Sequence, residues 1–387
     1  MPALFEQALA EPSFWRTIEP AVGPVGHWLI ARHPQWRALA PPESITQWST
    51  GTSAQRKRLF AHLRQTDPAR ASALLASDWK QLDFRERAAF LDLFTPTLSP
   101  ADEAFLEHCL DDRRQEVRRR AAALLARLEE ADLPKRLFKQ MNRHLQMAAD
   151  GTLRIELPKQ LDAPLIRDGI LEKSPADRAV GRKEGWLLQM LARIPPDWWV
   201  EQFEKPPAAC IRRFAQAGRP EHWLPALAEA ALRYRAGEWM EALLAYWQES
   251  GLAGPWKNSL AERLMDTISG EAFHRLVLGY LHEHGQLPPA GSLLAHLLTR
   301  RQPKWSESLS REFIRALQEW LSEQPSATLR SPVYREQLEA AAYHSDPELL
   351  DVLRRGWPVQ AASWRLWEKE VENFLNTLLF RREMRHA

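Results

Sequence analysis

Cysteine is scarce in this sequence, and long apolar stretches are absent. The 387 residues include two cysteines, Cys109 and Cys210, which are too few for a disulfide framework or a cysteine-rich zinc site. No run of about 18 apolar residues occurs, so a membrane-spanning helix is not expected. Residues 1–10 contain an acid and no basic stretch, which predicts that a secretory signal is absent. These absences predict a protein of the reducing cytoplasm with no membrane partner.

The short motifs that mark metal, nucleotide and nucleophile sites are also missing. The sequence contains no His-Glu-x-x-His or Cys-x-x-Cys pattern, no Gly-x-x-x-x-Gly-Lys loop and no Gly-x-Ser-x-Gly elbow. Acidic pairs such as Asp111-Asp112 stand at a predicted helix start, where capping explains them. We therefore expect no catalytic residue, no metal and no cofactor, and we expect that the protein is not an enzyme.

Tryptophan, by contrast, is abundant, with 17 residues spread along the chain. Indole rings can fill wide gaps between helix layers, or they can form a platform for nucleobases or for a partner. Because the tryptophans are scattered and are not clustered with arginine, we interpret them as packing residues. Cys109 lies beside Leu106 and Leu110 on a predicted helix, and we interpret it as a core residue too.

Two helical segments 33 residues apart share one pattern. Residues 84–91 and 117–124 both have the order apolar-Arg-x-Arg-Ala-Ala-x-apolar, and an acid, Asp83 or Glu116, precedes each. A repeat of about this length is typical of stacked helix pairs of the HEAT or armadillo kind. Such arrays provide surfaces for partners. The sequence therefore predicts an all-α fold, a HEAT/armadillo-like α-solenoid with one irregular insertion.

Helical periodicity covers almost every segment longer than ten residues. Before residue 150 we expect helices at residues 54–64, 69–76, 84–94, 101–110, 113–128 and 134–149. From residue 186 onward we expect them at 186–193, 198–204, 208–217, 222–234, 238–249, 259–269, 271–283, 292–300, 305–322, 332–344, 347–354 and 363–382. The sequence thus predicts an N-terminal helical-repeat half at residues 1–150 and a C-terminal helical half at residues 186–387.

The segment between these halves, residues 151–185, is irregular. Residues 152–158 alternate polar and apolar side chains and are the best strand candidate. Proline and glycine interrupt the rest of the segment, but its leucines and isoleucines favour an ordered insertion over a free linker. Within it, Arg167-Asp168-Gly169 is a candidate small-molecule or peptide pocket. The alternative is a turn in which the Arg–Asp pair is structural.

The net charge of the whole chain is only +2, but positive charge is concentrated between residues 113 and 143. Ten basic residues stand there beside four acids: Arg113, Arg114, Arg118, Arg119, Arg120, Arg127, Lys135, Arg136, Lys139 and Arg143. Such a patch could bind phosphate groups. The alternative is that these arginines pair with acids of a neighbouring repeat. Arg85 and Arg87, which occupy the equivalent positions of the earlier repeat, favour that alternative.

Several short motifs stand in order along the chain: His33-Pro34-Gln35-Trp36, Phe105-Leu106-Glu107, Asp111-Asp112-Arg113, Glu116-Val117-Arg118, Arg167-Asp168-Gly169, Gly181 with Trp186, and Phe374-Leu375 with Arg381, Glu383 and Met384. In type and order they resemble an uncharacterised bacterial family of HEAT-like helical-repeat proteins. The resemblance implies no activity and no catalytic residues. The genes of that family tend to lie beside those for MoxR-type AAA+ ATPases, von Willebrand A-domain proteins and SWIM zinc-finger proteins, which implies a helper role in such an assembly.

Together these observations predict a non-enzymatic cytoplasmic scaffold or adaptor that binds a protein partner along a groove. The alternative is a nucleic-acid-binding HEAT-like protein that uses a basic groove, with a role in DNA repair as one form of it. The candidate partner-binding residues are Arg113, Arg114, Arg119, Arg167 and Asp168.

Overall fold

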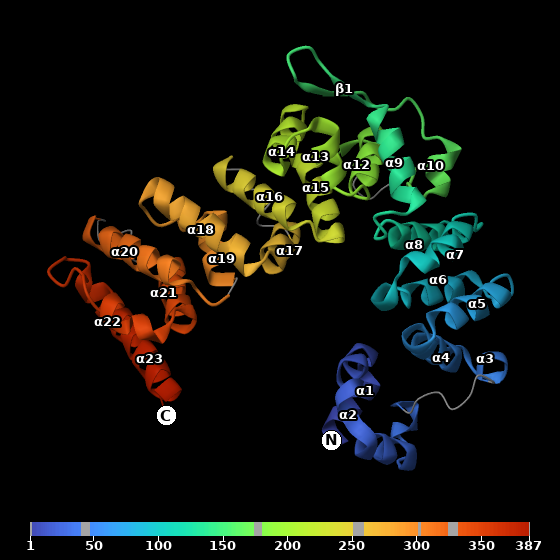
Figure 1. The fold of residues 1–387 in the computed structure, drawn as a ribbon, viewed down its shortest axis with the longest axis horizontal. Coiled ribbons are helices and arrows are strands. Elements are labelled where there is room, and N and C mark those ends of the chain that lie inside the picture. The colour runs from blue at the N-terminus through green and yellow to red at the C-terminus, as the bar shows by residue number, and fades with distance from the viewer. Residues whose placement is uncertain are drawn as a thin grey trace. The chain divides into compact units, whose positions relative to one another are not determined.

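The chain is mostly helical in a computed structural model that describes residues 2–39, 47–173, 180–250, 259–300, 303–323 and 332–386. This confirms the predicted all-α class. The contacts divide the chain into two units (Figure 1). Unit 1 consists of Met1–Leu133 with Ala163–Gly169, and unit 2 of Pro134–Asp162 with Ile170–Ala387. The predicted domain boundaries at residues 150 and 185 stay predictions. Residues 174–179 of the predicted insertion lie outside the described residues.

Most helices of unit 1 are short, although the second has 21 residues. In chain order they are α1 (Pro2–Ala10), α2 (Pro12–Arg32), η1 (Trp36–Leu39), α3 (Gln47–Thr50), α4 (Ser53–Thr66), α5 (Pro68–Asp78), α6 (Phe84–Asp92), η2 (Thr95–Thr97), η3 (Pro100–Asp102), α7 (Glu103–Cys109), α8 (Gln115–Leu125) and α10 (Ala163–Arg167). The helices α6 and α8, which carry the repeated pattern, pack against each other. The two matching segments are therefore neighbours in space as well as in sequence pattern.

Side-chain caps fix where several of these helices begin. The Thr52 hydroxyl accepts a hydrogen bond from the Gln55 backbone N–H, and the Gln55 side chain accepts one from the Thr52 N–H, which makes a capping box for α4. Asp67 caps α5, with Pro68 in the first turn. Asp83 accepts two backbone N–H groups at the start of α6.

Unit 2 contains most of the longer helices and the only sheet among the described residues. In chain order its elements are α9 (Asp132–Asn142, beginning in unit 1), β1 (Leu145–Met147), β2 (Leu153–Ile155), α12 (Arg182–Leu191), α13 (Asp197–Phe203), α14 (Pro207–Gln216), α15 (Pro220–Tyr234), α16 (Gly237–Glu249), α17 (Ser259–Thr267), α18 (Gly270–His284), α19 (Leu293–Arg300), α20 (Glu307–Glu323), α21 (Pro332–His344), η6 (Pro347–Leu349), α22 (Leu350–Leu353), η7 (Trp364–Leu366) and α23 (Glu368–His386).

Nine of the described helices of unit 2 form two rows, in which each helix contacts the next helix of its row. One row consists of α14, α16, α18 and α20, and a second row of α15, α17, α19, α21 and α23. Consecutive helices such as α15 and α16 also touch, so the two rows pack against each other. Each amphipathic helix thereby buries its apolar stripe against two or more neighbours.

Large aromatic side chains fill the space between these helices. Five indoles are among the largest fully buried side chains of the described chain: Trp199, Trp239, Trp247, Trp305 and Trp367. Cys109 is fully buried as well. The interpretation of these residues as core residues is confirmed for them. Trp28 is 58% exposed and is an exception.

The helix predicted over residues 134–149 is too long. The helix α9 ends at Asn142, and β1 follows at Leu145–Met147. The strand predicted near residues 152–158 exists as β2, and it pairs antiparallel with β1 in the register Leu145↔Ile155. The backbone groups of a lone strand would have no partners. The existence of β2 therefore requires a second strand, which the residues after α9 supply.

Candidate functional site

Three of the candidate partner-binding residues, Arg113, Arg114 and Arg119, are exposed and lie in unit 1, before and within the first turns of α8. The guanidinium of Arg114 lies over the ring of Phe84, 4.9 Å from its centre. Arg119 pairs with Glu116 on the same helix, with 3.1 Å between nitrogen and oxygen. No ion pair is recorded for Arg113 within the described residues. Two of the three candidates are thus already engaged within their own unit.

The neighbouring arginines bond to α6 and to the loop that precedes α8. Arg118 donates to the backbone carbonyl of Asp112 at 2.7 Å. Arg120 pairs with Asp92 of α6. In the opposite direction, Arg87 of α6 pairs at 2.7 Å with the buried carboxylate of Asp112. The alternative in which repeat arginines pair with acids of a neighbouring repeat is therefore confirmed for Arg120.

Of the five remaining basic residues, Arg127 lies in unit 1 and the other four belong to unit 2. Lys135, Arg136, Lys139 and Arg143 lie on or just after α9, in unit 2. The basic segment 113–143 is thus divided between the two units. Its continuity as one surface stays a prediction.

Arg167 fastens α10 to the end of α7. Its guanidinium donates to both carboxylate oxygens of Asp111, at 2.6 and 3.1 Å, and to the carbonyl of Glu107 at 3.2 Å. The hydrogen bond from Arg167 lowers the pKa of Asp111. Asp168 is 3% exposed and lies 3.5 Å from the same guanidinium. These contacts consume the charges that a ligand would have used.

Gly169 completes this turn and brings it against α8. Its φ is +80°, a conformation that favours glycine. A Cβ atom at this position would lie 2.6 Å from the Cβ of Ala122 on α8. The backbone therefore approaches α8 more closely than any other residue type allows. Arg167, Asp168 and Gly169 together favour the structural-turn alternative over a pocket.

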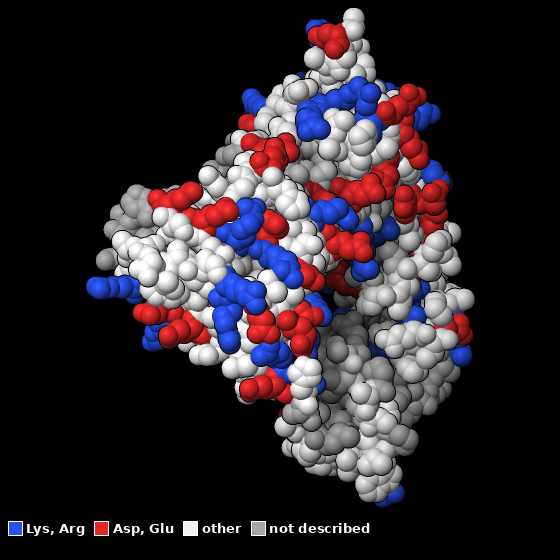
Figure 2. All heavy atoms as spheres, turned by 60° about the vertical axis from the view of Figure 1, so that its left-hand side comes forward, with Lys and Arg blue, Asp and Glu red and all other residues white. Residues whose placement is uncertain are grey.

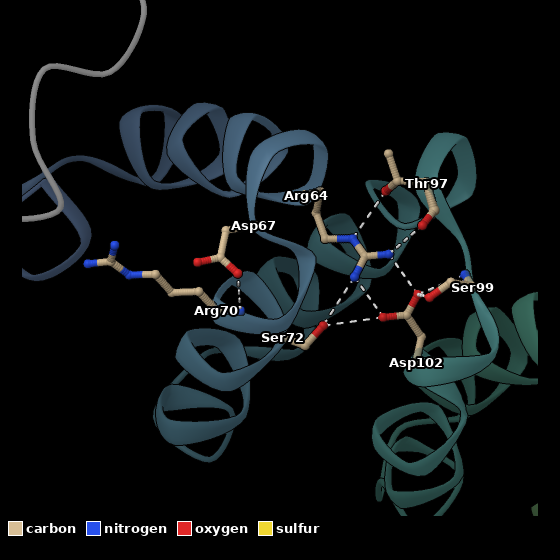
Figure 3. Close-up of polar contacts among 7 residues, drawn as sticks. All are labelled: Arg64, Asp67, Arg70, Ser72, Thr97, Ser99 and Asp102. Atoms are coloured by element: carbon tan, nitrogen blue, oxygen red, sulfur yellow. Dashed lines mark hydrogen bonds and ion pairs between the residues drawn. The ribbon is translucent and has the colours of Figure 1, made fainter.

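The densest polar cluster in unit 1 was not foreseen from the sequence. Arg64 of α4 and Asp102 of η3 form a bidentate pair with two 2.6 Å contacts (Figure 3), and both side chains are almost completely buried. The other N–H groups of Arg64 donate to the hydroxyl and carbonyl oxygens of Thr97 and to the hydroxyl of Ser72. The backbone N–H of Ser99 donates to Asp102 at 3.0 Å.

This cluster has the chemistry of a structural joint. All five N–H groups of the guanidinium have an acceptor, and the ring of Phe94 covers the guanidinium at 4.4 Å. A buried pair compensates its desolvation only when its hydrogen-bonding groups are satisfied, as they are here. No donor of Arg64 is left for a substrate.

The two thiols and the carboxylates also offer little chemistry. Burial raises the pKa of both thiols, that of Cys210 to about 11, so both are protonated and poorly nucleophilic at neutral pH. Within the described ranges, no three His, Cys, Asp or Glu side chains gather closely enough to hold a metal ion.

One His–carboxylate pair in unit 2 resembles an acid–base arrangement. His222 of α15 and Glu184 of α12 lie 3.0 Å apart, and Glu184 is 9% exposed. Arg219 faces the other carboxylate oxygen at 3.6 Å. Cationic and hydrogen-bonding partners on both oxygens are what a buried carboxylate needs to be stable. The geometry is that of a compensated buried charge that ties α12 to α15.

An open groove runs between α21 and α23, with a volume of about 1040 Å³. These helices are parallel neighbours, because contacts join both their starts and their ends. Arg335, near the start of α21, pairs with Glu370 near the start of α23. Arg381, near the end of α23, donates to the carbonyl of Ala342 near the end of α21 at 2.6 Å. The buried side chains of Leu338 and Phe374 line the groove.

The rims of this groove carry exposed carboxylates and aromatic rings. On α21 they are Glu336, Glu339 and Tyr343, which are spaced three and four residues apart and so follow one ridge of the helix. On α23 the rim includes Asn373 and Phe380. Tyr343 is 56% exposed and Phe380 is 61% exposed. A concave surface with exposed aromatic rings is typical of a protein-binding site.

Charged side chains of both signs lie on the visible surface. In Figure 2, basic and acidic side chains lie interspersed over the face shown, and neither sign covers it alone. Among the helices that the structure describes, none combines the length and the apolar character needed to cross a lipid bilayer. The surface in this view differs from the single-sign surfaces that bind nucleic acid without sequence preference.

Comparison with known proteins identifies a family without an assigned activity. The model of a family of unknown function, DUF5691, matches residues 1–387. Comparisons with curated proteins and with solved structures gave no significant match. The expected similarity to an uncharacterised family is thereby confirmed at the level of the family, and the chain belongs to the family of unknown function DUF5691.

Proposed function

We propose that this protein is a non-enzymatic scaffold or adaptor that binds a protein partner in the groove between α21 and α23. The observation that carries the proposal is the groove itself, an open cavity of about 1040 Å³ with two exposed aromatic side chains, Tyr343 and Phe380. Fully enclosed small-molecule sites seldom exceed this volume. An open groove between two parallel helices suits an extended or helical segment of a protein.

We further propose that the helix pairs stack as a HEAT-like α-solenoid. The two rows of helices in unit 2 support this, since each helix within a row touches the next helix of that row. Three exposed ion pairs join helices of these rows with one separation of 34 residues: Arg263 with Glu229, Arg275 with Glu241, and Arg300 with Asp266. A constant separation is expected when a structural unit repeats at that length.

The family resemblance suggests where the partner is to be sought. Proteins of MoxR-type AAA+ ATPase and von Willebrand A-domain systems are the first candidates, and a cytoplasmic location would suit such an assembly. A scaffold of stacked helices would hold two components at a fixed distance while contributing no chemistry of its own.

Co-purification with quantitative mass spectrometry tests this proposal. The tagged full chain would be recovered from its host as wild type and as the double variant Tyr343→Ala/Phe380→Ala. Because aromatic rings in such grooves carry much of the binding energy, we expect at least one protein to fall roughly tenfold or more in yield. The double variant Val352→Ala/Val359→Ala, which alters exposed side chains that do not line the groove, is the matched control.

A result without any protein that depends on the groove would contradict the proposal. The same purifications also report on the nucleic-acid alternative, in which Arg113, Arg114 and Arg119 contact phosphates. That alternative predicts co-purifying nucleic acid that is lost on reversing these three charges, and binding that weakens steeply with salt. The engagement of Arg114 and Arg119 with Phe84 and Glu116 favours the scaffold over it.

A further inference from the structure

We propose that the occupant of the α21–α23 groove is an amphipathic helix that carries lysine or arginine beside aliphatic residues. This inference rests on the proposed function and adds the chemistry of the partner to it. It follows from the distribution of charge and of apolar surface along the groove.

The groove carries negative charge on its α21 rim, where two carboxylates have no cationic partner within the described residues. Its two arginines are neutralised or occupied: Arg335 pairs with Glu370, and Arg381 donates to backbone carbonyls at the end of α21. Glu336 and Glu339 are exposed and form no ion pair within the described residues. The rim formed by α21 therefore presents two uncompensated negative charges on one helical ridge. Cationic side chains complement such a rim.

The apolar surface lies at the other end of the same groove. Tyr343 and Phe380 stand near the ends of the two parallel helices, whereas Glu336 and Glu339 precede Tyr343 by about two turns and one turn of α21. The ridge from Pro332 to Tyr343 is about 16 Å long at 1.5 Å per residue. A helix of roughly three turns fits this length, with cations over the carboxylates and aliphatic side chains between the aromatic rings.

Other occupants fit these features less well. The phosphates of nucleic acid would be repelled by Glu336 and Glu339. A second copy of the chain could bring an apolar ridge to Phe380, and the experiment below includes this outcome. A positively charged amphipathic helix satisfies both the carboxylates and the aromatic rings.

A peptide-binding measurement tests the inference. The probe is a fluorescein-labelled peptide of about 14 residues with leucine and lysine at helical spacing, and its partner probe has glutamate in place of every lysine. Fluorescence anisotropy with the full chain gives the dissociation constants at low and high salt. We expect the lysine peptide to bind at least roughly tenfold more tightly than the glutamate peptide, with a difference that shrinks as salt is added.

Charge reversal then locates the binding site. We expect Glu336→Lys/Glu339→Lys to weaken the lysine peptide roughly tenfold or more and to strengthen the glutamate peptide. The control Glu372→Lys/Glu383→Lys makes the same change in net charge at exposed positions that do not line the groove, and we expect it to change either affinity less than about twofold. Phe380→Ala should weaken the lysine peptide, and Val359→Ala should not. Circular dichroism melts of all variants confirm that they are folded.

Three outcomes would overturn the inference: equal binding of the two peptides, equal losses in the groove and control variants, or a dimer in sedimentation velocity that Phe380→Ala dissociates. The third outcome would make a second copy of the chain the occupant. If the lysine peptide fails to bind while a host protein still depends on Tyr343 and Phe380, the partner's chemistry is wrong and the scaffold stands. If no host protein depends on the groove, the proposed function itself fails.

Discussion

The two units join their helices with arginines in opposite surroundings. In unit 1, the Arg64 side chain is 1% exposed and connects α4 to the 3₁₀ turn that precedes α7. In unit 2, the Arg275 side chain is 59% exposed and connects α18 to α16 through Glu241. A buried arginine needs a hydrogen-bond acceptor for every N–H group, whereas water solvates an exposed arginine whenever its ion pair separates. The joint in unit 1 therefore depends on one buried pair, whereas the exposed pairs between the helix rows of unit 2 share their task among several weak contacts.

The difference also bears on how the proposed scaffold would tolerate change. The exposed pairs that bridge the helix rows can be lost one at a time, because each contributes little. The Arg64–Asp102 joint cannot, because removing one partner strands a charge in the core. Substitutions should therefore accumulate more readily on the helix faces of unit 2 than around Arg64.

The largest expected effect is at this joint. Asp102→Ala leaves the guanidinium of Arg64 buried without its counter-charge, so we expect unit 1 to lose about 3–5 kcal/mol of stability. Hydrogen–deuterium exchange on the full chain should show faster exchange in α4, α5 and α7, with the rows of unit 2 unchanged.

The double variant Arg64→Met/Asp102→Leu sharpens the same comparison. It removes both charges and keeps apolar volume, which for buried pairs is often neutral or stabilising. If the double variant recovers most of the protection against hydrogen exchange that Asp102→Ala loses, then the unpaired buried charge of Arg64, and not the missing contacts, causes that loss. A double variant that exchanges as fast as Asp102→Ala would contradict this account.

The fold was largely accessible from the sequence, because amphipathic periodicity and caps act locally. The cap at Asp67 and the apolar stripe of α8 are read from neighbouring residues, and the structure contains both. The sequence pattern did not predict the end of α9, since the following strand is stabilised by partners six to ten residues away. Local patterns do not record such pairings.

The sites were less accessible, because their residues meet only after folding. Arg64 and Asp102 are 38 positions apart, and nothing near either one marks it as buried. The groove is formed by α21 and α23, and in the sequence the residues of its rims have the pattern of ordinary exposed helix faces. The sequence does contain a signal of the helix rows: an acid stands 34 positions before each of Arg263, Arg275 and Arg300.

The next largest loss of stability is expected from substituting alanine for a glycine with positive φ, and two such glycines can be compared. Gly169→Ala forces a Cβ against Ala122 and a left-handed conformation on alanine, so we expect a loss of about 2–4 kcal/mol in unit 1. Gly151 in unit 2 has a φ of +81° and open space around it, so Gly151→Ala should cost about 1–2 kcal/mol from the conformation alone. Hydrogen exchange in α8 and in the β1–β2 hairpin measures the two losses, and equal losses would show that the approach to α8 is not tight.

A smaller effect should appear as a dependence on pH. The guanidinium of Arg167 holds the pKa of Asp111 below its usual range. A carboxyl whose pKa is lower in the folded state stabilises the fold above its unfolded pKa of about 3.9, and this contribution is lost as pH falls through the folded value. The protection of α7 and α10 against hydrogen exchange should therefore decrease from about pH 5 toward pH 3 in the wild type. In Asp111→Asn it should be lower at pH 5 and nearly constant, and a parallel decrease in both proteins would exclude Asp111 as the cause.

The smallest expected effect is in the exposed pairs of unit 2. Arg275→Ala removes two hydrogen bonds to Glu241, at 3.0 and 2.7 Å, but water replaces them on both partners. We expect only a slight loss of protection against hydrogen exchange, which disappears as NaCl is raised and the charges are screened. Hydrogen exchange in α16 and α18 at low and high salt measures it, with Arg263→Ala as a second pair of the same separation. A loss as large as that of Asp102→Ala would mean that exposed pairs, and not apolar packing, hold the helix rows together, and the contrast between the two units would fail.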